Sequence, residues 1–168
     1  MSFKEILPQD LHVNPFKMIG RDWMLVTAGT PEKVNTMTAS WGGLGEMWNK
    51  PAAFVVIRPQ RYTKEFIDRQ EAMSLSFYQE EFREKLSYLG TVSGRDEDKI
   101  AKAGLTPAFD GGIPYFQEAD TVMLVKKLYE DTYKPECFIE KQLDDRWYPE
   151  KDYHTLYICQ VQKILVRE

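Results

Sequence analysis

The stretch VNTMTASWGG, residues 34–43, begins as a β-strand and ends in a tryptophan followed by two glycines. Its side chains alternate between two faces, with Asn35, Met37, Ala39 and Trp41 on one and Thr36, Thr38 and Ser40 on the other. The preceding stretch DWMLVTAG, residues 22–29, also predicts a strand, and the turn TPEK joins the two into a hairpin. Small and hydroxyl-bearing side chains on such a strand let a flat ring approach the backbone. The alternative is an edge strand whose hydroxyls face water.

The pattern of elements continues outward from this hairpin. Further strands are predicted over residues 52–57, 72–78, 119–133 and 152–166, and helices over residues 62–69 and 80–90. A third helix begins within TVSGRDEDK, residues 91–99. We expect Thr63 to cap the first helix, and either Ser93 or Asp96 to cap the third. Because strands dominate, the sequence predicts a mainly antiparallel β-barrel with short helices.

The composition is that of an ordinary globular protein. A length of 168 residues favours one domain, which we place over residues 1–168. The net charge of −4 argues against a nucleic-acid surface, which needs a basic face. The N-terminal segment carries charges and prolines where a signal peptide has an apolar run, and no apolar run is long enough to span a membrane. We therefore expect a cytoplasmic protein without nucleic-acid or membrane partners.

Several kinds of reactive site find no support in the sequence. The two cysteines, Cys137 and Cys159, lack the spacing of metal ligands, and we interpret them as reduced thiols, with a thiol redox role left open. There are two histidines, His12 and His154, so no metal site is predicted. Motifs of serine hydrolases, zinc proteases, P-loop proteins and CxxC redox proteins do not occur.

Two basic stretches are candidates for binding an anion. RPQRYTKE places Arg58, Arg61 and Lys64 beside a predicted helix start, where free N–H groups favour anions. Arginine can also grip a phosphate with two parallel bonds. In TVSGRDEDK, the Ser-Gly turn can form a backbone anion nest that Lys99 reaches. A solvated basic loop and an ordinary capped helix are the alternatives for these two stretches.

Three stretches together resemble a known family. NTMTASWGG, KPAAFVVIRPQRYTKEFI and YLGTVSGRDEDKIAKAGLTP, in this order and at this spacing, resemble the flavin reductase-like family, in the branch of the flavoredoxin-like proteins. The resemblance covers residues 12 to 165. It implies a six-stranded antiparallel Greek-key split β-barrel that binds FMN and forms a homodimer with FMN near the interface.

The resemblance also implies which residues contact FMN. The segment from Asn35 to Trp41 would lie along the isoalloxazine ring and ribityl chain, and the two basic stretches would hold the phosphate and the ribityl hydroxyls. The residues carried over are Asn35, Met37, Thr38, Ala39, Ser40, Trp41, Arg58, Pro59, Gln60, Arg61, Tyr62, Thr63, Ser93 and Lys99. DYHTLYICQV resembles the last barrel strand of the family, with Cys159 at the position expected for glycine. His154 in this strand would contact nicotinamide or substrate, or else is a histidine bonded at a strand end.

The function implied by the resemblance is hydride transfer from NADH or NADPH to the N5 atom of FMN, with the protein binding and tuning the flavin. The acceptor of the electrons would be free flavin, a partner oxygenase or another molecule. The alternative is an FMN electron carrier that a protein partner reduces. No residue pattern distinguishes NADH from NADPH.

Overall fold

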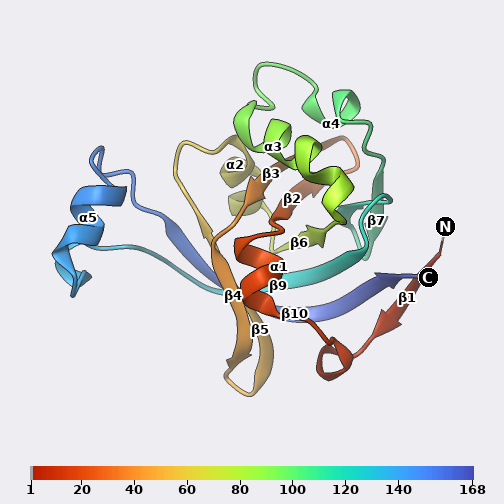
Figure 1. The fold of residues 1–168 in the computed structure, drawn as a ribbon, viewed down its shortest axis with the longest axis horizontal. Helices are drawn as coiled ribbons and strands as arrows, with labels where there is room; N and C mark the ends of the chain where they lie inside the picture. The colour runs from red at the N-terminus through yellow and green to blue at the C-terminus, as the bar shows by residue number, and fades with distance from the viewer. Residues whose placement is uncertain (1) are drawn as a thin grey trace.

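An antiparallel sheet dominates the computed structural model, which describes residues 2–168 (Figure 1). In this part of the chain, seven strands follow the order β3-β2-β6-β9-β10-β5-β4, and β1 joins the sheet by pairing with β10. The strands are β1 (Phe3–Ile6), β2 (Met24–Thr30), β3 (Lys33–Ala39), β4 (Gly42–Met47), β5 (Lys50–Ile57), β6 (Ala72–Phe77), β9 (Thr121–Thr132) and β10 (Thr155–Arg167). The prediction of a mainly β, antiparallel chain is confirmed. The sheet has eight strands where six were expected, and β1 and β4 were not among the predicted ones.

Short helices and turns lie between the strands. The helices are α1 (Pro15–Gly20), α2 (Tyr62–Arg69), α3 (Arg83–Thr91), α4 (Lys99–Lys102) and α5 (Lys141–Trp147), with 3-10 turns at Pro8–Asp10, Glu80–Phe82 and Pro135–Cys137. A separate hairpin is formed by β7 (Pro107–Asp110) and β8 (Ile113–Phe116). None of the helices in the described chain is long and apolar enough to cross a membrane.

The predicted hairpin is formed by β2 and β3, with Val26 opposite Met37. The strand ends at Ala39, so that Trp41 lies beyond it. The alternative of hydroxyls that face water does not hold at Thr36, because this threonine is fully buried. Its hydroxyl can be buried because it lies 2.8 Å from the hydroxyl of Thr27 and donates to a backbone carbonyl.

The apolar strands form the core. The run on β5 is buried as predicted, including Val55 and Ile57, and joins a cluster with Val26, Met73 and Tyr157. A second cluster lies where α3 meets the sheet, around the fully or almost fully buried side chains of Leu25, Leu86, Leu89, Phe116 and Val122. The stripe predicted on the helix over 80–90 therefore fixes α3 to the sheet.

Both predicted helix caps were wrong. Arg61 occupies the N-cap position of α2 without a side-chain cap, and the Thr63 hydroxyl instead accepts a bond from Asn35. The third helix begins only at Lys99, and its cap is Asp98, which accepts from the N–H of Ala101 at 3.1 Å. The residues before it first form a turn, in which the N–H of Asp96 donates to the Ser93 carbonyl.

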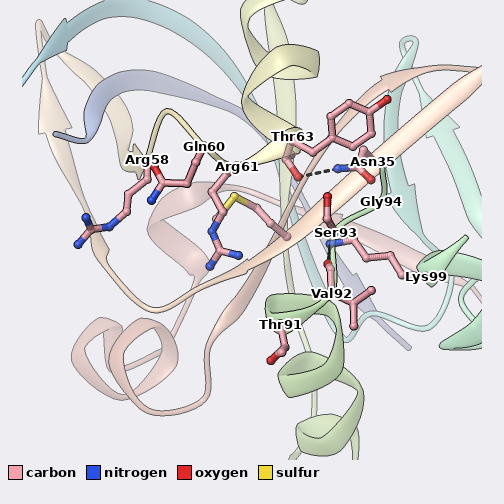
Figure 2. Close-up of a pocket in the computed structure, with 12 residues that line it drawn as sticks. Asn35, Arg58, Gln60, Arg61, Thr63, Thr91, Val92, Ser93, Gly94 and Lys99 are labelled. Carbon is pink, nitrogen blue, oxygen red and sulfur yellow. Dashed lines mark hydrogen bonds between the residues drawn. The ribbon is translucent and has the colours of Figure 1, made fainter. Parts of the chain in front are cut away.

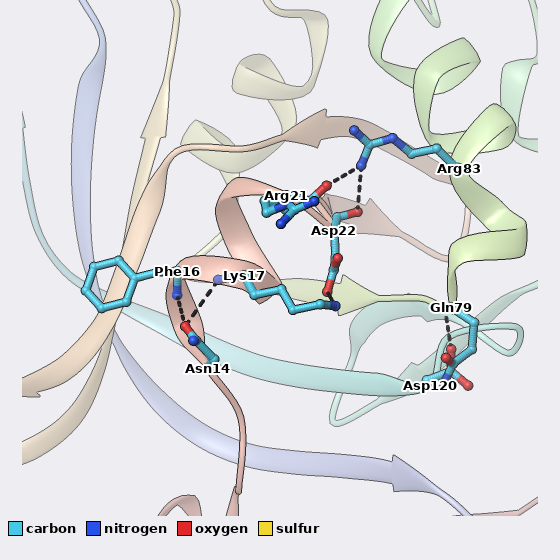
Figure 3. Close-up of polar contacts among 8 residues, drawn as sticks. All are labelled: Asn14, Phe16, Lys17, Arg21, Asp22, Gln79, Arg83 and Asp120. Carbon is cyan, nitrogen blue, oxygen red and sulfur yellow. Dashed lines mark hydrogen bonds and ion pairs between the residues drawn. The ribbon is translucent and has the colours of Figure 1, made fainter.

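The first turn of α3 is anchored to the end of α1, as Figure 3 shows. Arg83 donates to the backbone carbonyls of Arg21 and Asp22, and its guanidinium lies over the ring of Trp23. Lys17 forms an ion pair with Asp22 at 2.6 Å, which steadies the same loop. Because of these contacts, α3 holds a fixed position beside β3.

A long connection between β9 and β10 projects from the sheet and carries α5 (Figure 1). We call residues 133–154 the arm. Its surface is apolar in places, since Ile139 is 96% exposed and Trp147 is also exposed. Its inner part contains stacked rings, among them Tyr148 and Tyr153 with centroids 5.0 Å apart.

The turn of the β2–β3 hairpin depends on Gly29, whose φ is +142°. A Cβ at this position would lie 2.2 Å from the carbonyl oxygen of Lys33. We predict that Gly29→Ala lowers the free energy of unfolding by about 3 kcal/mol, through overpacking and backbone strain, measured by denaturant titration. Gly20→Ala is the matched control, because a Cβ there meets no atom within 4 Å. Equal stability of the two variants would contradict this reading of the turn.

Candidate functional site

Three segments that are distant in sequence enclose one cavity. They are β3, the loop from β5 into α2, and the connection from the end of α3 to α4 (Figure 2). The cavity measures about 340 Å³, within the usual range for small-molecule sites. It is lined by Asn35, Met37, Arg58, Gln60, Arg61, Tyr62, Thr63, Thr91, Val92, Ser93, Gly94 and Lys99. The three stretches singled out in the sequence therefore meet at one place.

Most of the predicted contacts lie in this cavity, namely Asn35, Met37, Arg58, Gln60, Arg61, Tyr62, Thr63, Ser93 and Lys99. The remaining ones, Thr38, Ala39, Ser40, Trp41 and Pro59, are not among its lining residues. The hydroxyl of Thr38 donates to the Leu86 carbonyl at 2.5 Å and so ties β3 to α3. Trp41 is 40% exposed and stands edge-on to Trp147, with ring centroids 5.0 Å apart.

Thr91, Val92 and Gly94 line the cavity but were not among the predicted contacts. The Ser-Gly turn in the sequence indicated a role for Gly94, because a glycine lets another segment approach the backbone closely. A Cβ on Gly94 would lie only 2.1 Å from Oδ1 of Asn35. The connection from α3 to α4 therefore lies directly against β3.

Asn35 joins two walls of the cavity. It is 4% exposed, and its Nδ2 donates to the hydroxyl of Thr63 at 2.9 Å. On the outer side, Tyr62 accepts a bond from Lys33 at 2.9 Å and lies under the guanidinium of Arg95. These contacts fix α2 against β3 and so form one side of the cavity.

Two cations lie at one end of the cavity. Lys99 is 3% exposed, and its Nζ donates to the carbonyls of Leu89 at 2.8 Å and Val92 at 2.9 Å. Burial, and secondly the charge of Arg61, lower the pKa of Lys99 to about 8. Arg61 donates to the carbonyl of Gly90 at 2.8 Å. Its pKa is lowered by burial and by the charge of Arg58, but a guanidinium keeps its charge at neutral pH.

Neither Arg61 nor Lys99 forms an ion pair with a carboxylate in residues 2–168. Carbonyl dipoles hold both side chains, but they do not neutralise the two charges. A partly buried pair of like charges that face one cavity favours the entry of an anion. This end of the cavity has the chemistry of a phosphate site.

Arg58 lies at the opposite end and points away from the other two cations (Figure 2). Its Nη1 donates to Oδ2 of Asp152 at 2.6 Å, and its Nη2 to the carbonyl of Trp147 at 2.8 Å. Its guanidinium also lies over the ring of Tyr148. Although Arg58 and Arg61 are three positions apart, the first is paired with an acid and the second is not.

His154 lies outside the cavity, in the aromatic cluster at the base of the arm. It is 7% exposed, its Nδ1 lies 2.7 Å from the hydroxyl of Tyr148, and its ring is tilted against Trp41. Burial, and secondly the charge of Arg58, lower its pKa to about 4, so the ring is neutral at pH 7. In this position His154 has the contacts of a histidine bonded at a strand end.

The cysteines and other potential metal ligands stand apart from the cavity. Cys137 is exposed and Cys159 is buried, and both are unpaired. Burial raises the pKa of Cys159 to about 12, so this thiol stays protonated. Within residues 2–168, histidine, cysteine and acidic side chains form no group that could hold a metal ion.

Comparison with known proteins identifies the family of this chain. The family model described as flavin reductase like domain matches residues 17–168. The chain belongs to the flavin reductase-like family. No curated protein matches the sequence of this family member.

Solved structures of other proteins are similar to this flavin reductase-like chain. An FMN-binding protein from Thermus thermophilus with bound p-hydroxybenzaldehyde is 22% identical, with a TM-score of 0.69 over 97% of this chain and 78% of that chain. Flavoredoxin of Desulfovibrio vulgaris (Miyazaki F) is 25% identical, with a TM-score of 0.67 over 87% of this chain and 69% of that chain. The styrene monooxygenase flavin reductase of Pseudomonas putida S12 is 16% identical, with a TM-score of 0.64 over 88% and 80%. The split-barrel fold expected from the sequence is thereby confirmed.

The close approach of Gly94 to Asn35 can be tested directly. We predict that Gly94→Ala displaces the Asn35 side chain and lowers the free energy of unfolding by about 1–3 kcal/mol, the usual effect of overpacking. The side-chain amide resonances of Asn35 should shift, because its bond to Thr63 is lost. Gly45→Ala on β4 is the control, since a Cβ there makes only ordinary contact at 3.7 Å. An unchanged amide signal in Gly94→Ala would show that the two walls do not touch.

The burial of Lys99 should appear in the pH dependence of stability. Its pKa is lower in the folded chain than in the unfolded one, so the unfolded chain binds more protons between pH 8 and 10.5 and stability rises with pH there. We predict that wild type gains about 3 kcal/mol relative to Lys99→Met between pH 7 and 10.5. Denaturant titrations at each pH measure this gain, and the exposed Lys102→Met is the control. A difference that is constant with pH would mean that the ammonium is not destabilised by burial.

Proposed function

We propose that this chain binds FMN in the cavity and reduces it with NADH or NADPH. The observation that carries the proposal is the pair of Arg61 and Lys99, two cations without a carboxylate partner in residues 2–168 that face one cavity. A flavin phosphate carries about two negative charges near neutral pH, which matches this pair. The family match and the FMN-binding protein among the similar structures support the choice of ligand.

The residues of the cavity suit the parts of FMN in different ways. Arg61, Lys99 and the hydroxyl of Ser93 would hold the phosphate. Asn35, Thr63 and Thr91 offer hydroxyl and amide groups to the ribityl chain. Met37 and the following residues to Trp41 would lie along the ring, as the resemblance implies.

When bound, FMN would supply the redox chemistry, which is hydride transfer between the nicotinamide and the flavin. The residues of this chain bind and orient the flavin and exclude water from its phosphate. No side chain is required to act as a proton donor or acceptor in this transfer. His154, neutral and bonded to Tyr148, would border the nicotinamide or substrate without donating a proton.

The proposal extends to partners and location. We propose a homodimer with FMN near its interface, in which the exposed Trp41, Ile139 and Trp147 are covered. The electrons would pass to free flavin, to a partner oxygenase or to another acceptor, and the reaction would take place in the cytoplasm. A second candidate function is an FMN electron carrier reduced by a protein, which the similarity to flavoredoxin supports.

Anaerobic reduction of the FMN-loaded protein tests the proposal. We expect the absorbance of bound flavin to bleach on addition of NADH or NADPH, and the faster donor names the physiological one. Flavin that stays yellow until dithionite is added would favour the electron carrier. A chain that binds no flavin would refute the proposed function altogether. Gel filtration of the same sample distinguishes a dimer from a monomer.

A further inference from the structure

The arm contacts the residues of the cavity through the Asp152 carboxylate and the Trp147 carbonyl. Asp152 lies where the arm returns to the sheet, and its Oδ2 accepts from Nη1 of Arg58 at 2.6 Å and from Nε2 of Gln60 at 2.7 Å. Both of these partners line the cavity. The carbonyl of Trp147, also in the arm, takes the second Nη of Arg58 at 2.8 Å. These contacts with the arm therefore fix the orientation of the Arg58 guanidinium.

The pairing between Arg58 and Asp152 is incomplete. In a bidentate pair, both carboxylate oxygens accept from the guanidinium. Here Arg58 and Gln60 both donate to Oδ2 of Asp152, while Oδ1 is buried and has no hydrogen-bond partner in the described chain. A carboxylate that uses one oxygen holds an arginine less firmly than a bidentate one does. Arg58 is thus held at the arm by one oxygen of Asp152 and by the carbonyl of Trp147.

The ion pair between Arg58 and Asp152 changes how many cations in the cavity are free to bind an anion. Arg58, Arg61 and Lys99 all line it, and Arg58 is near enough for its charge to act on Arg61. Asp152 neutralises Arg58, and Trp147 and Tyr148 help to keep the guanidinium at the arm. Of the three cations that line the cavity, two are then left for a ligand.

We propose that Asp152 is a specificity-determining residue that withholds Arg58 from the flavin phosphate and so limits the preference for FMN over riboflavin. This inference rests on the proposed function, because it concerns the same ligand. Asp152 acts through Arg58 and does not touch the flavin itself. Riboflavin lacks the phosphate, so its affinity does not depend on which way Arg58 points.

Dissociation constants for FMN and riboflavin, from quenching of flavin fluorescence, give the ratio that tests the inference. Asp152→Asn releases Arg58, and the preference for FMN over riboflavin should rise about tenfold, the effect of one charge-assisted bond. Riboflavin affinity should stay unchanged. Asp152→Asn combined with Arg58→Ala should return the ratio to that of wild type. Asp145→Asn, on the exposed surface of α5, is the matched control.

A second variant tests the inference independently if Asp152→Asn disturbs the structure of the arm. Arg58→Ala in the wild-type background should change the ratio less than about twofold, because Arg58 is already committed to Asp152. A tenfold loss in this variant would show that Arg58 serves the phosphate in wild type, and would overturn the inference. So would a ratio that stays constant or falls in Asp152→Asn. These results leave FMN binding intact, whereas a wild type that binds neither flavin removes the proposed function and the inference together.

Discussion

The last turn of α3 is the point on which the site depends. A helix ends with carbonyls that have no partner within the helix, and these must find donors elsewhere. Here Leu89 and Gly90 accept from Lys99 and Arg61, and Val92 just beyond accepts from Lys99 as well. One helix end is thus satisfied by two charged side chains from separate segments. The same bonds bring α2, α3 and α4 together around the cavity.

Burying the Lys99 ammonium at this helix end costs desolvation free energy, and the fold does not require a lysine there. An uncharged side chain would avoid the desolvation of an ammonium at the position of Lys99. Structural roles at a helix end are commonly filled by a glycine or by a solvent-exposed lysine. A lysine that is 3% exposed, beside a second cation and without an acidic partner in the described chain, suits the binding of an anion better than it suits stability. Such a lysine lowers stability, and binding of the proposed anion would offset that cost.

Local patterns predicted a large part of this architecture. The β2–β3 hairpin, the apolar strand β5 and the helix over 62–69 follow from alternation, turn chemistry and periodicity, which involve neighbours in sequence. The three basic and hydroxyl-rich stretches also led to the cavity. The cap predicted at Thr63 was wrong because the hydroxyl of Thr63 accepts a bond from Asn35, which is 28 positions away. Competition of this kind depends on tertiary contacts that no local pattern records.

Arg58 and Arg61 show that the sequence alone does not predict which arginine can bind an anion. Both lie in RPQRYTKE, and as sequence they offer the same chemistry to a phosphate. In the structure, Arg61 donates to the carbonyl of Gly90, and this neutral acceptor leaves the charge of Arg61 uncompensated. Arg58 instead donates to Asp152, 94 positions away, whose carboxylate neutralises its charge. The capacity of an arginine to bind an anion is therefore set by the charge of its nearest partner and not by its own position in a motif. For these two residues, that partner comes from α3 in one case and from the arm in the other, so the end of the cavity next to α3 is the end prepared for negative charge.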